Sequence, residues 1–194
     1  MSKVAVLTND LQYDLVQKNI ERIEAVGNAT RTICDFLDKM RSLEVPIIHL
    51  QLINNPDDPN AERYGSYLPV IKGSEGARII AEFLHKSDIV IEKNKDSGFY
   101  ETELEKTLKE LGINTVIITG MQTQICVQTT AADAFFRGFK VIIPEDAVVS
   151  AREEDKERAL DWLDSYCAQV LTCEEIYERL KEHEDFEPKK IYIA

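Results

Sequence analysis

Three residues of different chemical types follow apolar, strand-like runs and could act together in catalysis: Asp10, Lys93 and Cys126. A thiolate is a strong nucleophile, and a neighbouring carboxylate can take the proton that the thiol must lose. A lysine beside that carboxylate keeps it ionised, so that it can act as a general base. Each residue alone is weak evidence, because carboxylates often cap helices and most lysines are solvated. Together they predict covalent catalysis by a cysteine.

Cys126 lies where a strand, a turn and a helix follow one another, and Thr123 or Gln124 is expected to begin the helix. The first turn of a helix offers unpaired N–H groups and the positive end of the helix dipole. Both favour the thiolate, so we expect a lowered pKa for Cys126, and the same N–H groups could hold an oxyanion. A small buried structural cysteine is the alternative interpretation. The remaining cysteines have no CxxC spacing and are expected to be structural free thiols: Cys34, Cys167 and Cys173.

The elements that must position these residues alternate between apolar, β-branched runs and helical patterns. Continuous apolar runs are typical of strands covered on both faces of a parallel sheet, and their alternation with helices predicts βαβ units. We therefore predict a single-domain, doubly wound α/β fold with about six mainly parallel strands and helices on both faces. In such sheets ligands bind beyond the carboxyl ends of the strands. The predicted strands are 4–7, 47–50, 89–91, 116–118, 141–143 and 170–171.

Helix signals fill the intervening segments. A helix from about Ala25 to Leu43 would bury Ile33, Leu37 and Met40 on one face. A Ser or Thr followed three residues later by Glu predicts a capping box at the start of a helix. This pattern occurs at Thr102, Ser150 and Thr172.

Two segments interrupt the alternation. Residues 53–76 hold three Pro, three Asn and three Gly, and a long insertion of this kind usually shapes a site. A plain surface loop is the alternative, in which case its Arg63, Tyr64 and Tyr67 would be ordinary surface residues. We divide the chain into one domain at 1–181 and a C-terminal tail at 182–194. The tail is expected to be either a frayed end or an arm onto a neighbouring subunit.

Composition excludes several classes of protein. The 194 residues carry a net charge of −12, which disfavours binding to nucleic acids because their phosphates are also negative. No apolar run approaches the ~18 residues of a membrane span. The amino terminus enters a strand-like run without the features of a signal peptide, so we expect a cytoplasmic protein. The sequence also lacks a P-loop, a GxGxxG motif and the usual spacings of metal ligands, so we expect no metal and no cofactor.

Three motifs resemble those of the isochorismatase-like cysteine hydrolase superfamily. Residues 10–14 (DLQYD) resemble its DxQxD motif, and residues 119–127 (TGMQTQICV) resemble TGxxTxxCV. Residues 93–99 (KNKDSGF) are similar to its K-x-x-x-S-A-F motif, with Gly98 in place of Ala. The resemblance extends from about Lys3 to Leu180 and is weakest in the insertion. It implies an isochorismatase-like, Rossmann-like fold.

The resemblance also implies roles for single residues. The Asp–Lys–Cys triad of the family falls on Asp10, Lys93 and Cys126. A cis peptide bond would join Met121 to Gln122, and the backbone N–H groups of Gln122 and Cys126 would form the oxyanion hole. Substrate contacts are expected from four residues in or near the motifs and the insertion: Gln12, Arg63, Tyr64 and Phe99.

The activity that the resemblance implies is hydrolysis of a small amide or carbamoyl (ureido) compound through a thioester, with release of ammonia. The nicotinamidase branch carries a DxH-type metal site after the second strand, whereas residues 49–54 read HLQLIN here. This difference predicts a metal-free enzyme and argues against nicotinamidase activity. Hydrolysis of a vinyl ether, a non-catalytic binding role and a redox-sensing thiol are the alternatives. The resemblance further implies a homo-oligomer.

Overall fold

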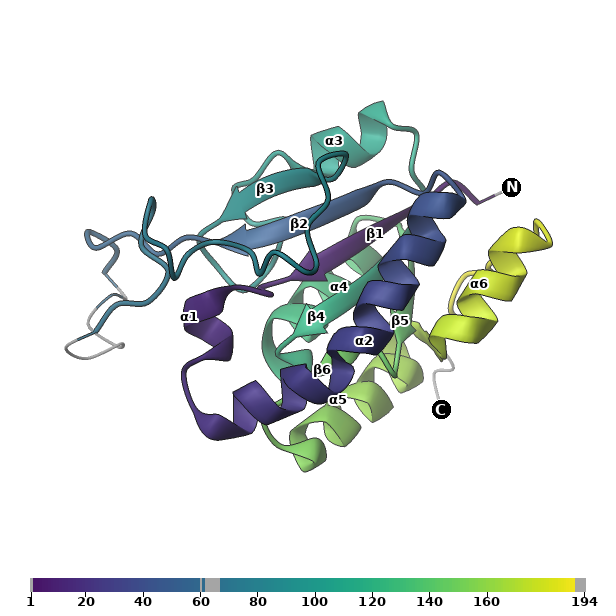
Figure 1. The fold of residues 1–194 in the computed structure, drawn as a ribbon. Coiled ribbons are helices and arrows are strands. Elements are labelled where there is room, and N and C mark those ends of the chain that lie inside the picture. Colours follow the sequence, from purple (N-terminus) through teal and green to yellow (C-terminus); the bar gives the residue numbers. More distant parts are fainter. Residues whose placement is uncertain (1, 60, 62–66, 191–194) are drawn as a thin grey trace.

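The computed structural model describes residues 2–59, 61 and 67–190, and Figure 1 shows a sheet between two layers of helices. Within the described residues the strand order is β3-β2-β1-β4-β5-β7, and β6 pairs with β4. Every pairing among these strands is parallel, which confirms the predicted doubly wound α/β fold. The strands are β1 Val4–Asn9, β2 Ile47–Leu52, β3 Ile89–Lys93, β4 Thr115–Met121, β5 Lys140–Pro144, β6 Val148–Val149 and β7 Gln169–Leu171.

The helices divide between the two faces of the sheet (Figure 1). One hydrophobic core joins the sheet to α3, α4 and α5, and the other joins it to α2 and α6. Ile33, Leu37 and Met40 lie on the face of α2 that packs against the sheet and are fully buried, as their spacing predicts. The helices are α1 Tyr13–Val16, α2 Ile20–Ser42, α3 Leu104–Glu110, α4 Gln128–Phe136, α5 Glu153–Tyr166 and α6 Cys173–Lys181, and a π-helical turn, Thr123–Val127, precedes α4.

The starts of the helices are the least accurate part of the prediction. The helix predicted from Ala25 begins at Ile20, because the side chain of Asn19 accepts a hydrogen bond from the N–H of Arg22 and caps it. The capping box at Thr172 is present and starts α6. The other two predicted boxes were wrong. Thr102 lies one residue before the N-cap of α3, Glu103, and its hydroxyl donates to Gly98 O. Ser150 lies two residues before the N-cap of α5, Arg152, and its hydroxyl donates to Gln124 Oε1.

The tail, as far as Lys190, packs against its own chain. Phe186 is completely buried in the core beneath α2 and α6, and Lys140 Nζ donates to its carbonyl oxygen. The described part of the tail therefore shares a core with the preceding domain instead of fraying from it. No helix among the described residues has the length and apolar character needed to cross a membrane.

Candidate active site

The strand order places the predicted catalytic residues at one edge of the sheet. From β1 the chain proceeds outward to β2 and β3, then returns to the other side of β1 to form β4. Ligand sites of doubly wound sheets lie at such a reversal, beyond the carboxyl ends of the strands. Asp10 follows β1 directly, and Cys126 lies in the turn after β4. Asn9 and Gly120 are paired at the ends of these two strands, so both segments leave the sheet side by side.

Gly120 allows this close approach. Its φ of +102° is unfavourable for other residues, and a Cβ there would lie 2.3 Å from Asn9 O. A second glycine replaces the alanine of the K-x-x-x-S-A-F motif, and a Cβ on Gly98 would lie 2.4 Å from Leu50 Cδ1. The side chain of Leu50 therefore occupies the space that a methyl group would take. A side chain at Gly120 would push β1 and β4 apart, and one at Gly98 would displace Leu50.

Asp10 and Lys93 form a buried ion pair. Lys93 Nζ lies 3.0 Å from each carboxylate oxygen and donates its hydrogen bond to Oδ2. Its other N–H groups donate to the carbonyl oxygens of Lys95 at 3.1 Å and Asp96 at 3.2 Å. Burial alone would lower the pKa of Lys93, but its attraction to Asp10 and Cys126 raises that pKa overall. The lysine is therefore a charged ammonium with all of its donors engaged.

The Asp10 carboxylate is poised to accept a proton. Burial raises its pKa above the ordinary value of 3.8, and the attraction of Lys93 opposes this rise only in part. Interaction with the Cys126 thiol also favours the ionised carboxylate. Oδ1 makes no hydrogen bond within the described part of the chain, so it is the oxygen that is available to take the proton.

The pKa of Cys126 corrects the sequence-based expectation. It is raised well above the ordinary value of 9.0, chiefly by burial and then by the negative charge of Asp10. Lys93 lowers it, but not enough to compensate. The Cys126 thiol donates a weak hydrogen bond to Asp96 Oδ1 at 3.7 Å. A low-dielectric site between carboxylates stabilises the thiol over the thiolate, so the resting cysteine is protonated and needs a base.

The turn that carries Cys126 begins with the expected cis peptide bond between Met121 and Gln122. The π-helical turn then starts at Thr123, one of the two predicted starting positions. The Gln122 side chain is held by Ala151, whose N–H donates a hydrogen bond to Gln122 Oε1 at 3.1 Å. The residues proposed to form the oxyanion hole, Gln122 and Cys126, thus lie before and within one braced turn.

A cavity of about 170 Å³ opens beside Asp10 and Cys126. Two sequence-based candidates are not part of its wall among the described residues. Gln12 is completely buried under the insertion, and Phe99 packs in the core with its ring centroid 5.9 Å from that of Phe139. Arg63 and Tyr64 lie outside the described residues. The cavity is lined by Asp10, Leu15, Lys18, Arg22, Leu52, Pro69, Asp96, Met121, Gln122, Ile125 and Cys126.

Three charged residues of this wall were missed from the sequence: Lys18, Arg22 and Asp96. Asp96 lies inside the recognised 93–99 motif, so its position could have identified it. Lys18 and Arg22 face the cavity because α1 ends at Val16 and α2 starts at Ile20. A helix that is predicted to begin at Ala25 leaves Lys18 and Arg22 in a loop, whose position the sequence does not determine.

Two residues of the DxQxD motif, Gln12 and Asp14, bind the backbone of neighbouring segments. Gln12 Nε2 donates to Leu52 O at 2.8 Å and Ala77 O at 2.7 Å, and its Oε1 accepts from Leu52 N at 2.8 Å. Asp14 Oδ2 accepts from Val70 N at 2.8 Å. These bonds tie both ends of the insertion to the segment that follows Asp10.

Replacing Gln12 with leucine is expected to lower the free energy of unfolding by about 2–4 kcal/mol. The change removes three buried hydrogen bonds and leaves backbone groups of Leu52 without their partner. Denaturant titration measures the loss, and Gln17→Leu at an exposed position is the matched control. Equal stability of the two variants would contradict the bracing role of Gln12.

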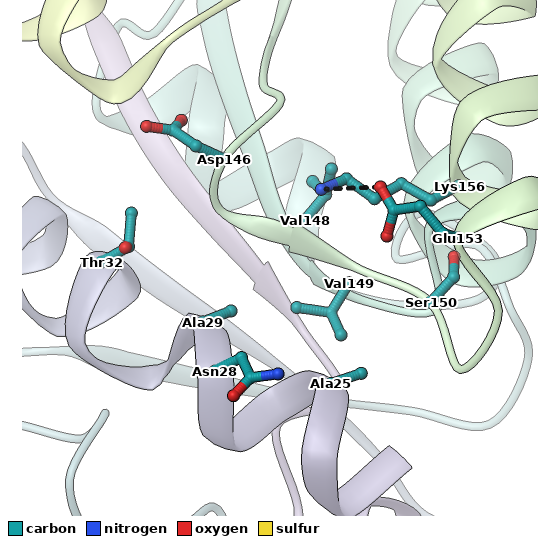
Figure 2. Close-up of a pocket in the computed structure, with 10 residues that line it drawn as sticks. All are labelled: Ala25, Asn28, Ala29, Thr32, Asp146, Val148, Val149, Ser150, Glu153 and Lys156. Carbon is teal, nitrogen blue, oxygen red and sulfur yellow. Dashed lines mark ion pairs between the residues drawn. The ribbon is translucent and has the colours of Figure 1, made fainter. Parts of the chain in front are cut away.

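A second cavity, of about 240 Å³, lies between α2, β6 and the start of α5 (Figure 2). Its wall combines Asn28 and Thr32 of α2 with Asp146, and Lys156 is 3.8 Å from Glu153 across its other side. Ser150 also lines it, but its hydroxyl is engaged with Gln124. None of the described residues that line this cavity carries a thiol, so the candidate active site is the one at Cys126. Among the described residues no group of three or more His, Cys, Asp or Glu side chains could hold a metal ion.

Known proteins share this architecture. The N-carbamoylsarcosine amidase from Thermoplasma acidophilum has a TM-score of 0.79 at 29% identity, covering 88% of this chain and 96% of that one. An isochorismatase-like hydrolase from Alkaliphilus metalliredigens has a TM-score of 0.82 at 28% identity, covering 95% and 94%. Nicotinamidase 3 of Arabidopsis thaliana is 33% identical over 110 residues, which are 55% of this chain and 56% of that protein.

The chain spans about half the length of the curated relatives it matches. A family model described as the isochorismatase domain, in contrast, matches residues 4–175, from the first strand into the last helix. That match includes all three predicted motifs and every strand of the described sheet. The chain therefore belongs to the isochorismatase domain family.

Proposed function

We propose that this protein is a cysteine-dependent hydrolase that cleaves a C–N bond in a small amide or carbamoyl compound and releases ammonia. The observation that carries this proposal is that Asp10 and Cys126 line one cavity, with a protonated thiol beside a buried carboxylate that is paired with Lys93. The names of several relatives point to the same bond: nicotinamidase, N-carbamoylsarcosine amidase, and ureidoacrylate amidohydrolase from Methylobacterium radiotolerans.

The first half of the reaction forms an acyl-enzyme. Asp10 takes the proton from Cys126 Sγ, and the thiolate attacks the substrate carbonyl carbon. The backbone N–H groups of Gln122 and Cys126 hold the oxyanion of the tetrahedral intermediate. Asp10 then gives its proton to the nitrogen as the C–N bond breaks, so that ammonia leaves. The product on the enzyme is a thioester, or a thiocarbamate when the substrate is a carbamoyl compound.

The second half regenerates the enzyme. Asp10 takes a proton from water, whose oxygen attacks the thioester carbon and forms a second oxyanion in the same hole. The C–S bond breaks, and Cys126 recovers its proton from Asp10. The ammonium of Lys93 lies next to Asp10 and carries the opposite charge, so it favours the ionised form of the buried carboxylate before each proton transfer.

Ammonia release from a panel of small primary amides and ureido acids tests the proposal. We expect release that is lost in Cys126→Ala and is insensitive to a chelator. Chelator-sensitive release would contradict the metal-free mechanism, and release that persists in Cys126→Ala would contradict the nucleophile. A small-molecule substrate, a homo-oligomeric assembly and a cytoplasmic location remain predictions of the sequence.

The pH dependence of kcat/KM should show one rising limb on the acid side. Asp10 must be ionised to act as the base, and its pKa is raised above 3.8, so activity is lost as the pH falls through that raised value. On the alkaline side the raised pKa of Lys93, ordinarily 10.5, predicts a plateau beyond pH 9. A rising limb at the ordinary cysteine value of 9.0 would contradict the scheme, since the thiol would then ionise without Asp10.

A further inference from the structure

Two cations stand on the wall of the active-site cavity and are not used by the proposed mechanism. Arg22 lies in the first turn of α2 and is half-buried, and Lys18 lies at the exposed rim between α1 and α2. In a chain with a net charge of −12, two neighbouring positive charges at the active site are unexpected. Their placement calls for an explanation beyond the general composition of the surface.

Neither cation is neutralised by the part of the chain that the structure describes. Arg22 Nη1 donates to Leu15 O at 3.0 Å, a bond that anchors the guanidinium without using its charge or its other donors. None of the ion pairs between described residues involves Arg22 or Lys18. The carboxylate of Asp10, to which Arg22 is electrostatically coupled, is already paired with Lys93. A half-buried guanidinium with free donors is suited to binding an anion.

The opposite charge lies elsewhere in the same cavity. Asp96 comes from the loop after β3, and its Oδ1 accepts a hydrogen bond from the Cys126 thiol. Arg22, in contrast, comes from α2, which is a separate element from the loop that carries Asp96. The cavity therefore has a hydrogen-bond acceptor near the nucleophile on one element and unpaired cations on another. A substrate in it would be oriented by both.

We infer that the substrate is a small carboxylate-bearing amide or ureido acid, whose carboxylate binds Arg22 and Lys18 while its NH₂ group donates to Asp96. This assignment rests on the proposed function and adds the class of substrate to it. The planar guanidinium can hold a carboxylate through two parallel hydrogen bonds, and the exposed Lys18 adds charge at the rim. The cavity of about 170 Å³ has room for a compact molecule.

The test compares acids with neutral molecules of the same shape. Succinamic acid is paired with 4-methylpentanamide, and N-carbamoylglycine with isobutylurea, so that an isopropyl group replaces the carboxylate. We expect kcat/KM for at least one acid to exceed that of its neutral partner by about 10- to 100-fold, the range for hydrogen bonds to a charged group. Arg22→Gln should collapse this ratio, mainly through KM for the acid. Arg22→Lys should restore part of it, because it keeps the charge but not the planar fork.

Two further variants separate binding from folding. Arg31→Gln, on the same helix with a side chain that is 92% exposed, is the matched control and should leave the ratio unchanged. Lys18→Gln changes an exposed residue that cannot unfold the protein, and it should lower the ratio by a smaller factor. Circular dichroism of each variant checks the fold.

The outcomes distinguish this inference from the proposed function. Cys126-dependent release of ammonia with equal or greater kcat/KM for the neutral partners would overturn the carboxylate assignment and leave the hydrolase intact. A ratio that survives Arg22→Gln would also overturn it. If no compound is turned over, calorimetric binding of the four compounds to Cys126→Ala decides: preference for an acid that needs Arg22 supports the assignment, and the absence of binding at millimolar concentration overturns it.

Discussion

Cys126→Ala is expected to lower kcat/KM by at least about 10⁴-fold, equivalent to ~5 kcal/mol of transition-state stabilisation. The reason is that no acyl-enzyme can form when the nucleophile is missing, and no neighbouring side chain can replace it. The fold should survive, because alanine fits the space of the thiol and leaves the Asp10–Lys93 pair intact. Steady-state release of ammonia measures the loss, and a thermal melt close to that of the unaltered protein shows that it is chemical.

Cys34→Ala is the matched control for this prediction. Cys34 is a half-buried thiol on α2 that donates to Glu82 O at 3.4 Å, away from the cavity. Activity of this variant should equal that of the unaltered protein. Comparable losses in both variants would indicate a general effect of thiol removal and would contradict a nucleophilic role for Cys126.

The Lys93→Met variant is expected to lose both stability and activity. Methionine keeps the length of the side chain but leaves Asp10, which is 3% exposed, as a buried charge without its partner. Breaking a buried ion pair from one side costs about 3–5 kcal/mol. Asp10 reduces that cost in part by taking up a proton, and a protonated carboxyl cannot act as the base. Turnover at neutral pH should therefore fall by about 10²–10⁴-fold, the range contributed by general bases.

A double variant separates these two effects. Asp10→Asn together with Lys93→Met removes both charges, so it should recover part of the stability lost in Lys93→Met while staying inactive. Residual activity of Lys93→Met should also rise with pH above neutrality, as the acid limb moves upward with the pKa of Asp10. Full activity of Lys93→Met at neutral pH would show that the lysine is not needed to keep Asp10 ionised.

The residues of the site that sequence reasoning locates best are those fixed by strand ends. Asp10, Lys93 and Cys126 each follow an apolar run, and a parallel sheet brings the carboxyl ends of its strands to one edge. The prediction therefore depends on the topology, and the other six strands of the described sheet, each longer than β6, were located correctly. The missed strand, β6, has only two residues, Val148–Val149, and no pattern can be recognised over that length.

The failures concern quantities that depend on three-dimensional neighbours. The dipole of a helix start favours a thiolate at Cys126, but burial and nearby carboxylates outweigh it, and neither can be read from local sequence. Gln12 follows Asp10 closely in sequence, yet its amide binds the backbone on both sides of the insertion. Arg22 was missed for a different reason. The cap made by Asn19 starts α2 at Ile20, before the residue at which the apolar pattern begins.

The pairing of β1 with β4 also has a kinetic consequence. Asp10 follows β1 and the turn with Cys126 follows β4, and the side chain of Asn9 donates to Thr119 O, 110 positions along the chain. Closing so long a loop is entropically costly, and contacts distant in sequence slow folding. A nascent or truncated chain that ends before Met121 contains Asp10 and Lys93 but lacks Cys126. Recovery of hydrolysis during refolding should consequently follow the docking of these two central strands, while far-ultraviolet circular dichroism would report the faster, local formation of α2.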